Sequence, residues 1–173
     1  MNQQLENQFS AFEQKRKAMI ADLRNLGAQK LHEQPEGKWS AIQNINHLIL
    51  SEAGVLMYLK KKMQGIDSLK EAGFRNWFAY QIVWFYTYLP LKVKAPKGLD
   101  NPSNEESLEE VEAKWDQLRA SWKDFVSQLP EKQLNLAIFK HPMLKPRLNI
   151  YQSIGFCEAH FLRHKRQINN TLR

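Results

Sequence analysis

The sequence predicts an all-α protein, a bundle of four long helices with one additional short helix and long crossover loops. Three observations support this fold class. Apolar residues recur at three- and four-residue steps over long segments, which is the period of a helix that faces a core. Patterns of the form S-x-x-Q and S-x-x-E mark helix starts, and stretches with proline and glycine separate the segments. Four long segments of this kind are typical of a helical bundle.

The first helix is predicted over residues 2–27. Its apolar stripe is interrupted only by Arg16, and a turn that contains Pro35 and Gly37 comes after it. This spacing predicts that one face of the helix packs against the core. The stripe consists of Leu5, Phe9, Phe12, Met19, Leu23 and Leu26.

The second helix is predicted to begin at Ser40 and to stop before Gly65. Ser40 and Gln43 have the residue types of a capping box, in which each side chain bonds the backbone amide of the other residue. The third and shorter helix is predicted over residues 74–89. Because it is apolar nearly all round, we expect it to be buried.

A long irregular connection, "PLKVKAPKGLDNPS", leads to the fourth helix. This helix is predicted from Ser107, where "SLEE" is another capping box, to the residue before Pro130. A second connection contains three prolines, and only its "LAIF" stretch is expected to be extended. Asn149 and Gln152 then predict the start of the last helix, which runs to about Asn170.

Length and composition limit the class of protein. The chain has 173 residues, the size of one domain, and we expect residues 1–173 to form it. A single cysteine, Cys157, excludes an internal disulfide and suits a reducing cytosol. The N-terminus lacks the apolar segment of a signal peptide, and the most apolar run, residues 77–91, is shorter than the roughly 20 residues that span a bilayer. We therefore expect a soluble, cytoplasmic protein without a membrane partner.

The chain is basic, with 25 Lys and Arg against 18 Asp and Glu and a net charge of +7. The basic residues are spread over short clusters such as 60–62 and 163–166, and no nucleic-acid reading module is visible. These two clusters could attract an anionic thiol or carboxylate, but charge at a helix end is the simpler interpretation. Nucleic acid is therefore a disfavoured partner.

Two histidines near the C-terminus are the first candidates for a functional site. His160 and His164 are one helical turn apart, which separates them by about 6 Å of rise and about 40° of rotation. The stripe on which they lie is apolar at both ends, so we expect them to point inward. His47, on the second helix, is a third candidate. Three neutral imidazoles suit Zn²⁺, Ni²⁺ or a similar divalent metal ion and leave a coordination position open. The alternative is that they are core histidines that form hydrogen bonds within the protein.

The segments "KWSAIQNINHLILSEA" and "HPMLKPRLNIYQSIGFCEAHFLRHKRQI" resemble the DinB/YfiT-like family of small bacterial helical bundles. In that family a Trp-Ser pair opens the second helix, whose histidine is a metal ligand, and a His-Pro turn precedes a last helix with H-x-x-x-H. The resemblance implies a four-helix bundle of the DinB/YfiT-like type in which His47, His160 and His164 bind the metal ion. The turn after His141 departs from the family, because it reads "MLKPRL" where a glycine before Leu-Thr is usual.

The resemblance also implies a class of function. Characterised relatives use the metal to bind a low-molecular-weight thiol that attacks an electrophile, so the first hypothesis is a metal-dependent thiol S-transferase. The same open site would serve a metal-dependent hydrolase. The alternative from another class is a non-catalytic metal-binding protein associated with stress, and a nucleic-acid binder ranks last. The expected partner is a small-molecule substrate. The sequence does not decide whether the chain forms a homodimer, and it identifies no catalytic residue.

Five further residues are weighed against simpler structural roles. Cys157 is one turn from His160, but a buried cysteine more often acts as a small apolar residue. Glu52 and Glu158 could support a metal site as acceptors or as a general base, yet solvated surface charge is the simpler expectation. His141 is expected to shape the turn before proline, and His32 to lie on the surface without a partner.

Aromatic residues of the third predicted helix could roof a substrate pocket or pack in the core. Their helical spacing favours the core. They are Trp77, Tyr80, Trp84, Phe85 and Tyr88.

Overall fold

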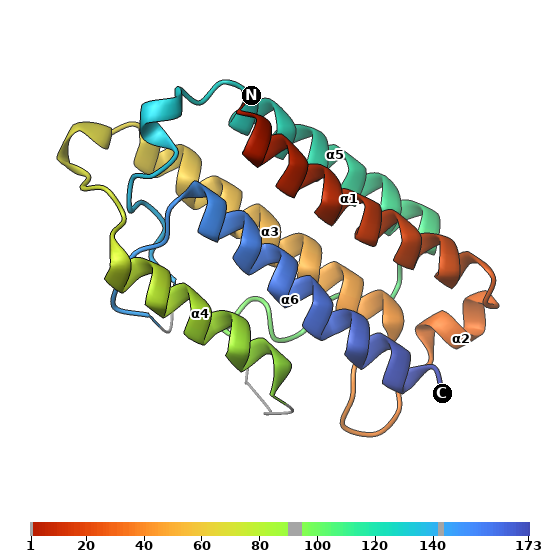
Figure 1. Ribbon diagram of the computed structural model, residues 1–173. Helices are drawn as coiled ribbons and strands as arrows, with labels where there is room; N and C mark the ends of the chain where they lie inside the picture. Colours follow the sequence, from red (N-terminus) through yellow and green to blue (C-terminus); the bar gives the residue numbers. More distant parts are fainter. Residues whose placement is uncertain (1, 90–94, 142–143) are drawn as a thin grey trace.

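A computed structural model describes residues 2–89, 95–141 and 144–173. Within these residues the chain forms six α-helices and no β-strand, so the predicted all-α class is confirmed (Figure 1). Single turns of 3₁₀ helix lie at Ile66–Ser68 and Glu131–Gln133. The helices are α1 (Gln3–Arg24), α2 (Ala28–His32), α3 (Ala41–Met63), α4 (Phe74–Tyr88), α5 (Leu108–Ser127) and α6 (Ile150–Thr171).

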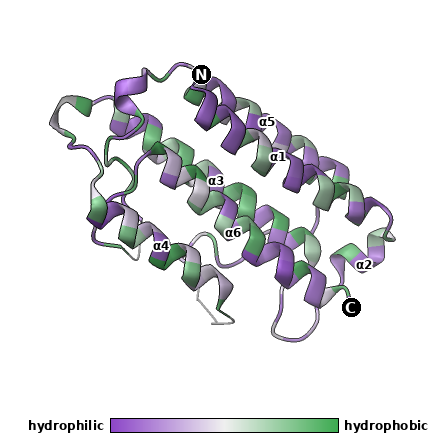
Figure 2. Cartoon of the chain, in the orientation of Figure 1, coloured by the Kyte–Doolittle hydropathy of each residue, from purple (hydrophilic) through white to green (hydrophobic). Residues whose placement is uncertain are grey.

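Four of these helices form the bundle that the sequence predicts. α3 packs against both α5 and α6, and α1 packs against the same two helices. The shorter α4 lies outside this group, along α6 (Figure 1). The outer surfaces of α1 and α5 are largely hydrophilic (Figure 2), because their apolar stripes turn inward. The largest fully buried apolar side chains are Trp115, Trp122, Phe12, Phe161, Leu5, Met19, Ile20, Ile42, Ile45, Leu48 and Leu59.

The three predicted helix starts are confirmed in detail. Ser40 Oγ accepts from the Gln43 amide at 3.0 Å, and Gln43 Oε1 accepts from the Ser40 amide at 3.0 Å. Ser107 forms the same reciprocal pair with Glu110 at the start of α5. At the start of α6, Asn149 forms it with its partner three residues later. These caps satisfy backbone donors that have no partner inside the helix.

The first predicted helix is too long by one turn. α1 ends at Arg24, because the backbone at Gly27 is extended and begins the separate short helix α2. His32, on α2, is not the unpartnered surface residue that we expect from the sequence. Its Nδ1 lies 2.7 Å from the carbonyl oxygen of Asn104, whose side-chain amide donates to the carbonyl of His32 at 2.9 Å.

Part of the connection between α4 and α5 is tied to the first turns of α3. Gln43 donates to the carbonyl oxygen of Pro102 at 3.4 Å, and Asn46 donates to that of Ser103 at 3.0 Å. The Ser40 hydroxyl bonds the side chain of Asn104. This connection therefore lies against the same end of α3 that carries His47. Its residues 90–94 lie outside the described part of the chain.

The extended piece predicted around "LAIF" is confirmed, because Phe139 forms an isolated antiparallel bridge with Leu148 just before α6. Residues 142–143, in the predicted His-Pro turn, lie outside the described part of the chain.

The interior of the bundle contains charged groups as well as apolar ones. Arg16, the one interruption of the first apolar stripe, is 1% exposed and pairs with Glu13 and Asp116. Arg119, from α5, donates to Glu13 at 2.9 Å and to Glu52 of α3 at 3.1 Å. The expectation that Glu52 is solvated is therefore wrong, since it is buried and ion-paired.

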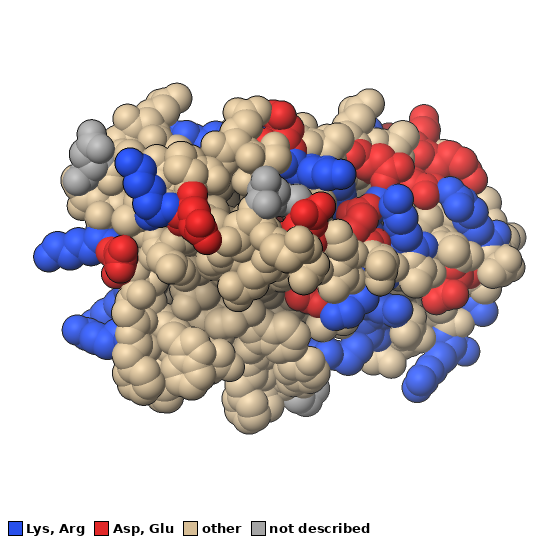
Figure 3. All heavy atoms as spheres, turned by 45° about the horizontal axis from the view of Figure 1, so that its top comes forward, with Lys and Arg blue, Asp and Glu red and all other residues tan. Residues whose placement is uncertain are grey.

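On the surface, basic and acidic side chains are interspersed over the face shown in Figure 3, consistent with the scattered clusters in the sequence. No α-helix in the described segments has the length and hydropathy needed to cross a bilayer.

Candidate metal centre

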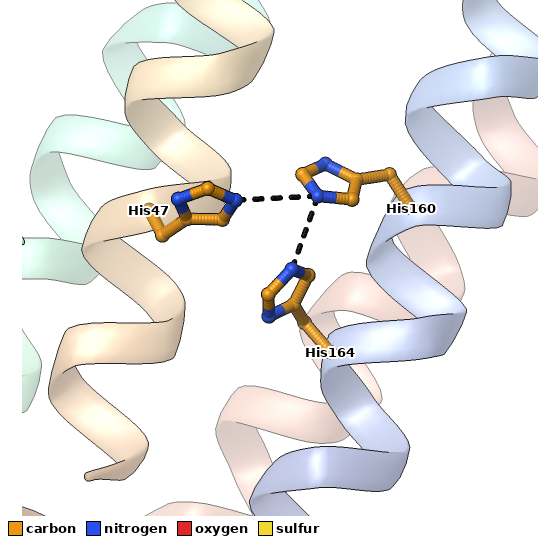
Figure 4. Close-up of side chains that lie close together, drawn as sticks. All are labelled: His47, His160 and His164. Carbon is orange, nitrogen blue, oxygen red and sulfur yellow. Dashed lines mark hydrogen bonds between the residues drawn. The ribbon is translucent and has the colours of Figure 1, made fainter. Parts of the chain in front are cut away.

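Three histidines from two helices meet at the positions that the sequence singles out. His47 extends from the second turn of α3, and His160 and His164 extend from successive turns of α6 (Figure 4). The Nε2 atoms of His47 and His160 are 3.3 Å apart, and those of His160 and His164 are 3.0 Å apart. One ligand atom from each of the three rings lies within 4.8 Å of the other two.

This spacing matches the coordination geometry of a single cation. A tetrahedral zinc ion with nitrogens at about 2.0–2.1 Å places its ligand nitrogens about 3.3 Å from one another. The nitrogen separations of 3.3 and 3.0 Å are close to that value. Two of the three separations therefore already match those of ligands to a single ion, and the three nitrogens all lie within 4.8 Å of one another.

Hydrogen bonds to the outer ring nitrogens set the tautomers of two of the rings. His47 Nδ1 lies 2.9 Å from the carbonyl oxygen of Leu99, to which it can only donate. His164 Nδ1 lies 2.7 Å from Asn44 Oδ1. The Asn44 amide is oriented because its Nδ2 donates to backbone carbonyls at the start of α3. Each of these two rings therefore turns an unprotonated Nε2 toward His160.

His160 then faces two lone pairs with a single ring nitrogen. Its Nε2 carries at most one hydrogen, so it can donate to only one of the two neighbouring Nε2 atoms. A cation removes this conflict, because it accepts the lone pairs of all three nitrogens. The set of ligand atoms thus fits a divalent metal ion of borderline softness such as Zn²⁺ or Ni²⁺.

The surroundings favour the neutral, ligating form of each ring. Burial lowers the pKa of His47, although its bond to the Leu99 carbonyl acts in the opposite direction. Burial lowers the pKa of His160 to about 3, with repulsion from neighbouring positive charge as the smaller cause. The pKa of His164 is lowered for the same two reasons. Metal binding therefore does not have to displace a proton from an imidazolium.

Aromatic rings pack against the histidines and limit their rotation. Trp39 packs against His47 at a centroid distance of 4.9 Å and stacks on His164 at 6.1 Å. Phe156 stacks on His160 at 5.9 Å with an interplanar angle of 7°. His47 and His164 are buried, whereas His160 is partly exposed. Of the three residues, His160 is therefore the one most exposed to solvent.

The other candidates from the sequence lie around this group and are not part of it. Cys157 is buried and burial raises its pKa well above the ordinary value, so the thiol stays protonated. Glu158 is mostly buried and pairs with Lys15 at 2.5 Å, so the expectation of a solvated carboxylate is wrong here too. Glu52 bonds Arg119 and Trp115 instead of a histidine.

His141 lies closer to the site than its predicted role in a turn suggests. It is buried and packs edge-on against Phe156 at a centroid distance of 4.6 Å. A positive charge on His141 would disfavour protonation of His160 and lower the pKa of His160. Burial lowers the pKa of His141 to about 4. It is therefore a neutral neighbour of the three histidines rather than one of the converging ligands.

Two supporting groups were not identified as functional from the sequence. Asn44 precedes His47 by three residues, so its place on the same face of α3 was visible, but its bond to a ring on another helix was not. The Leu99 carbonyl is a backbone group in an irregular connection, and no side-chain pattern reveals it.

Comparisons with known proteins agree with this architecture. The model of the DinB superfamily matches residues 11–168. No curated protein matches the sequence. A crystal structure of a protein from Streptococcus pneumoniae is similar with a TM-score of 0.58 at 14% identity, covering 96% of this chain and 88% of that one. Such a likeness shows the fold alone. Because the family match spans most of the sequence and includes all three histidines, the chain belongs to the DinB superfamily.

Proposed function

We propose that this protein is a metal-dependent enzyme that holds one divalent cation through His47, His160 and His164. The observation that carries the proposal is the convergence of one ring nitrogen from each of three histidines within 4.8 Å, with two of the separations, 3.3 and 3.0 Å, close to those of metal ligands. Three protein ligands leave a coordination position for a substrate or water, which is the pattern of catalytic rather than structural zinc sites.

The preferred reaction is transfer of a low-molecular-weight thiol to an electrophile. A bound divalent cation supplies a Lewis acid that stabilises the deprotonated form of a thiol or of water. The chain contributes neutral imidazoles, two of them fixed by Asn44 and Leu99, aromatic rings packed against them at Trp39 and Phe156, and a partly exposed His160. Thiol transfer is preferred over hydrolysis because of the family resemblance, which is an argument by analogy.

Metal content tests the ligand assignment. Purified wild-type protein that is loaded with Zn²⁺ or Ni²⁺ and then desalted should retain one ion per chain, as measured by inductively coupled plasma mass spectrometry. His160→Ala should lose most of it, because two imidazoles hold such an ion far more weakly than three. His32→Ala is the matched control, since His32 bonds Asn104 away from the site. Equal metal content in wild type and His160→Ala would rule out the assignment.

A second experiment separates an enzyme from a metal-binding protein without turnover. Wild type and His160→Ala are screened for conjugation of small thiols to an electrophilic dye, and for ester hydrolysis, each with and without chelator. The proposal expects turnover by the metal-loaded wild type that chelation abolishes. Metal retention without chelator-sensitive turnover on any thiol or ester would support the non-catalytic alternative.

A further inference from the structure

Helix α4 exposes a continuous row of large apolar side chains. They lie at three- and four-residue steps, so they follow one side of the helix over its whole length. The opposite side of α4, with Ala79 and Val83, is buried against the bundle. The exposed residues and their exposed fractions are Phe74 (76%), Trp77 (49%), Phe78 (55%), Ile82 (49%), Phe85 (68%) and Tyr88 (54%).

The expectation that this helix is buried is therefore wrong for a single copy of the chain. A helix that is apolar on all sides is normally covered on all sides, and Arg75 is the only charged residue within α4. The face in Figure 3 has, toward its lower left, an area almost free of charged side chains. Apolar surface of this extent marks an interaction site in soluble proteins.

The size of this surface suits a protein–protein contact. A large aromatic side chain offers about 200 Å² of surface, so the exposed parts of the six residues amount to roughly 700 Å². A stable interface of standard size needs about 800 Å² from each partner. The α4 face alone supplies most of that area, and the neighbouring residues before α6 extend it.

We propose that the exposed side of α4 binds the same side of α4 in a second copy of the chain. A pocket of about 350 Å³ opens beside the N-terminal half of α4, between Phe78, Ile82 and the residues Leu144 and Pro146. In the C-terminal half, Phe85 projects from the same side without a cover. One face thus carries both a pocket and the projecting aromatic ring of Phe85, as a self-complementary two-fold interface requires.

An antiparallel crossing centred near Gln81 joins these two features. It sets residue 85 of one copy opposite residues 77–78 of the other, so that each Phe85 enters the partner's pocket. The antiparallel arrangement also places the N-terminus of each α4 beside the C-terminus of the other, which the helix dipoles favour. A membrane surface fits less well, since interfacial helices flank their apolar side with many Lys and Arg residues.

Sedimentation velocity over a range of concentrations tests the dimer. The wild-type protein should sediment as a species with twice the 20.4 kDa mass of one chain. Phe85→Glu should weaken dimerisation at least about 30-fold, the effect expected for loss of a buried aromatic anchor. Met57→Glu is the matched control, because Met57 is 70% exposed but lies on α3, and it should dimerise like wild type.

Disulfide trapping tests the geometry. Gln81 is exposed at the centre of the row, so Gln81→Cys should form a covalent dimer under mild oxidation and appear as such on a non-reducing gel. Met57→Cys should not, and the native Cys157 is buried and does not interfere.

The proposal is overturned if wild type is a monomer at every concentration, or if Phe85→Glu and Met57→Glu dimerise equally. It is also overturned if monomeric wild type binds anionic phospholipid vesicles through Phe85. A dimer that Phe85→Glu dissociates but Gln81→Cys does not trap would reject the antiparallel crossing.

Discussion

At the scale of single residues, the orientation of two of the three histidines depends on a polar group that is not one of the proposed ligands. Asn44 Oδ1 holds Nδ1 of His164, and the Leu99 carbonyl holds Nδ1 of His47. Such partners select the tautomer and limit ring rotation, and their loss commonly weakens metal binding 10- to 100-fold.

Replacing Asn44 by leucine should therefore reduce metal affinity by about 10- to 100-fold while all three histidines remain. The side chain keeps its approximate size, but His164 loses the acceptor that fixes its Nε2 toward the site. Competition with a chromophoric chelator measures the affinity.

Ser153→Ala is the control, because Ser153 is equally buried on the other helix of the site and donates to the Asn149 carbonyl rather than to a histidine or to residues 99–104. If Asn44→Leu binds the metal as tightly as wild type does, Asn44 does not orient His164 for metal binding.

The sequence predicts the histidines better than it predicts their supports. His160 and His164 can be placed on one face because helix geometry fixes the relation between residues four apart. The convergence with His47 depends on how α3 packs against α6, which spacing alone does not determine. The environment of Glu52 was missed because its partner, Arg119, lies on a different helix.

At the scale of helices, α4 is positioned by a close approach to α6. An ideal Cβ on Gly155 would lie 2.0 Å from the Tyr80 hydroxyl oxygen, so only glycine leaves room for this tyrosine. Trp84 donates to the same oxygen at 2.5 Å, and burial raises the pKa of Tyr80 to about 12. The phenol is thus fixed as a neutral contact between the two helices.

Gly155→Ala should consequently lower the free energy of unfolding by about 1–3 kcal/mol, the usual cost of overpacking. Gly54→Ala provides the contrast, because a Cβ there meets nothing within 4 Å; it should stabilise α3 by up to about 1 kcal/mol. Urea denaturation measures both values.

The clash with Tyr80 is tested by repeating Gly155→Ala in a Tyr80→Ala background. The loss in free energy of unfolding caused by Gly155→Ala should then be smaller. An unchanged cost would show that the glycine serves another purpose.

Helix starts were predictable because capping boxes are local in sequence, as at Ser40 and Ser107. The end of α1 was not, since Leu26 continues the apolar period although the backbone has already left the helix. The exposure of α4 was also missed, because apolar residues on all sides predict a buried helix without revealing what buries it.

At the scale of the whole molecule, a buried ion-pair network joins three helices of the bundle. Arg119 of α5 bonds Glu13 of α1 and Glu52 of α3, and its guanidinium lies over the rings of Phe9 and Phe12 at 4.1 and 4.3 Å. Burial raises the pKa of Glu52, and the bonds from Arg119 only partly oppose this effect. The carboxylate therefore depends strongly on this one cation.

Arg119→Met should lower the free energy of unfolding at neutral pH by about 3–5 kcal/mol, because it leaves Glu52 buried without its cation. The folded-state pKa of Glu52 then rises further above the unfolded value. A raised carboxyl pKa penalises the folded state at high pH, and the penalty falls as acidification protonates the group. The destabilisation should therefore diminish as the pH is lowered, in denaturant titrations at several pH values.

Adding Glu52→Gln to Arg119→Met removes the titrating group and should abolish most of this pH dependence. A loss of stability in Arg119→Met that is the same at every pH would argue against Glu52 as its cause.

The hydrogen bonds that fasten residues 99–104 to the start of α3 have a further consequence. The group that steadies His47 belongs to this connection, so occupation of the histidines and order in the connection are reciprocal: each must favour the other by the same free energy. Slower hydrogen exchange at the amides of residues 99–104 would then reveal a filled centre without any spectroscopic signal from the ion. For the proposed metal ion, the same reciprocity lets a change of sequence in the connection, at a residue that is not itself a ligand, tune how tightly the ion is kept.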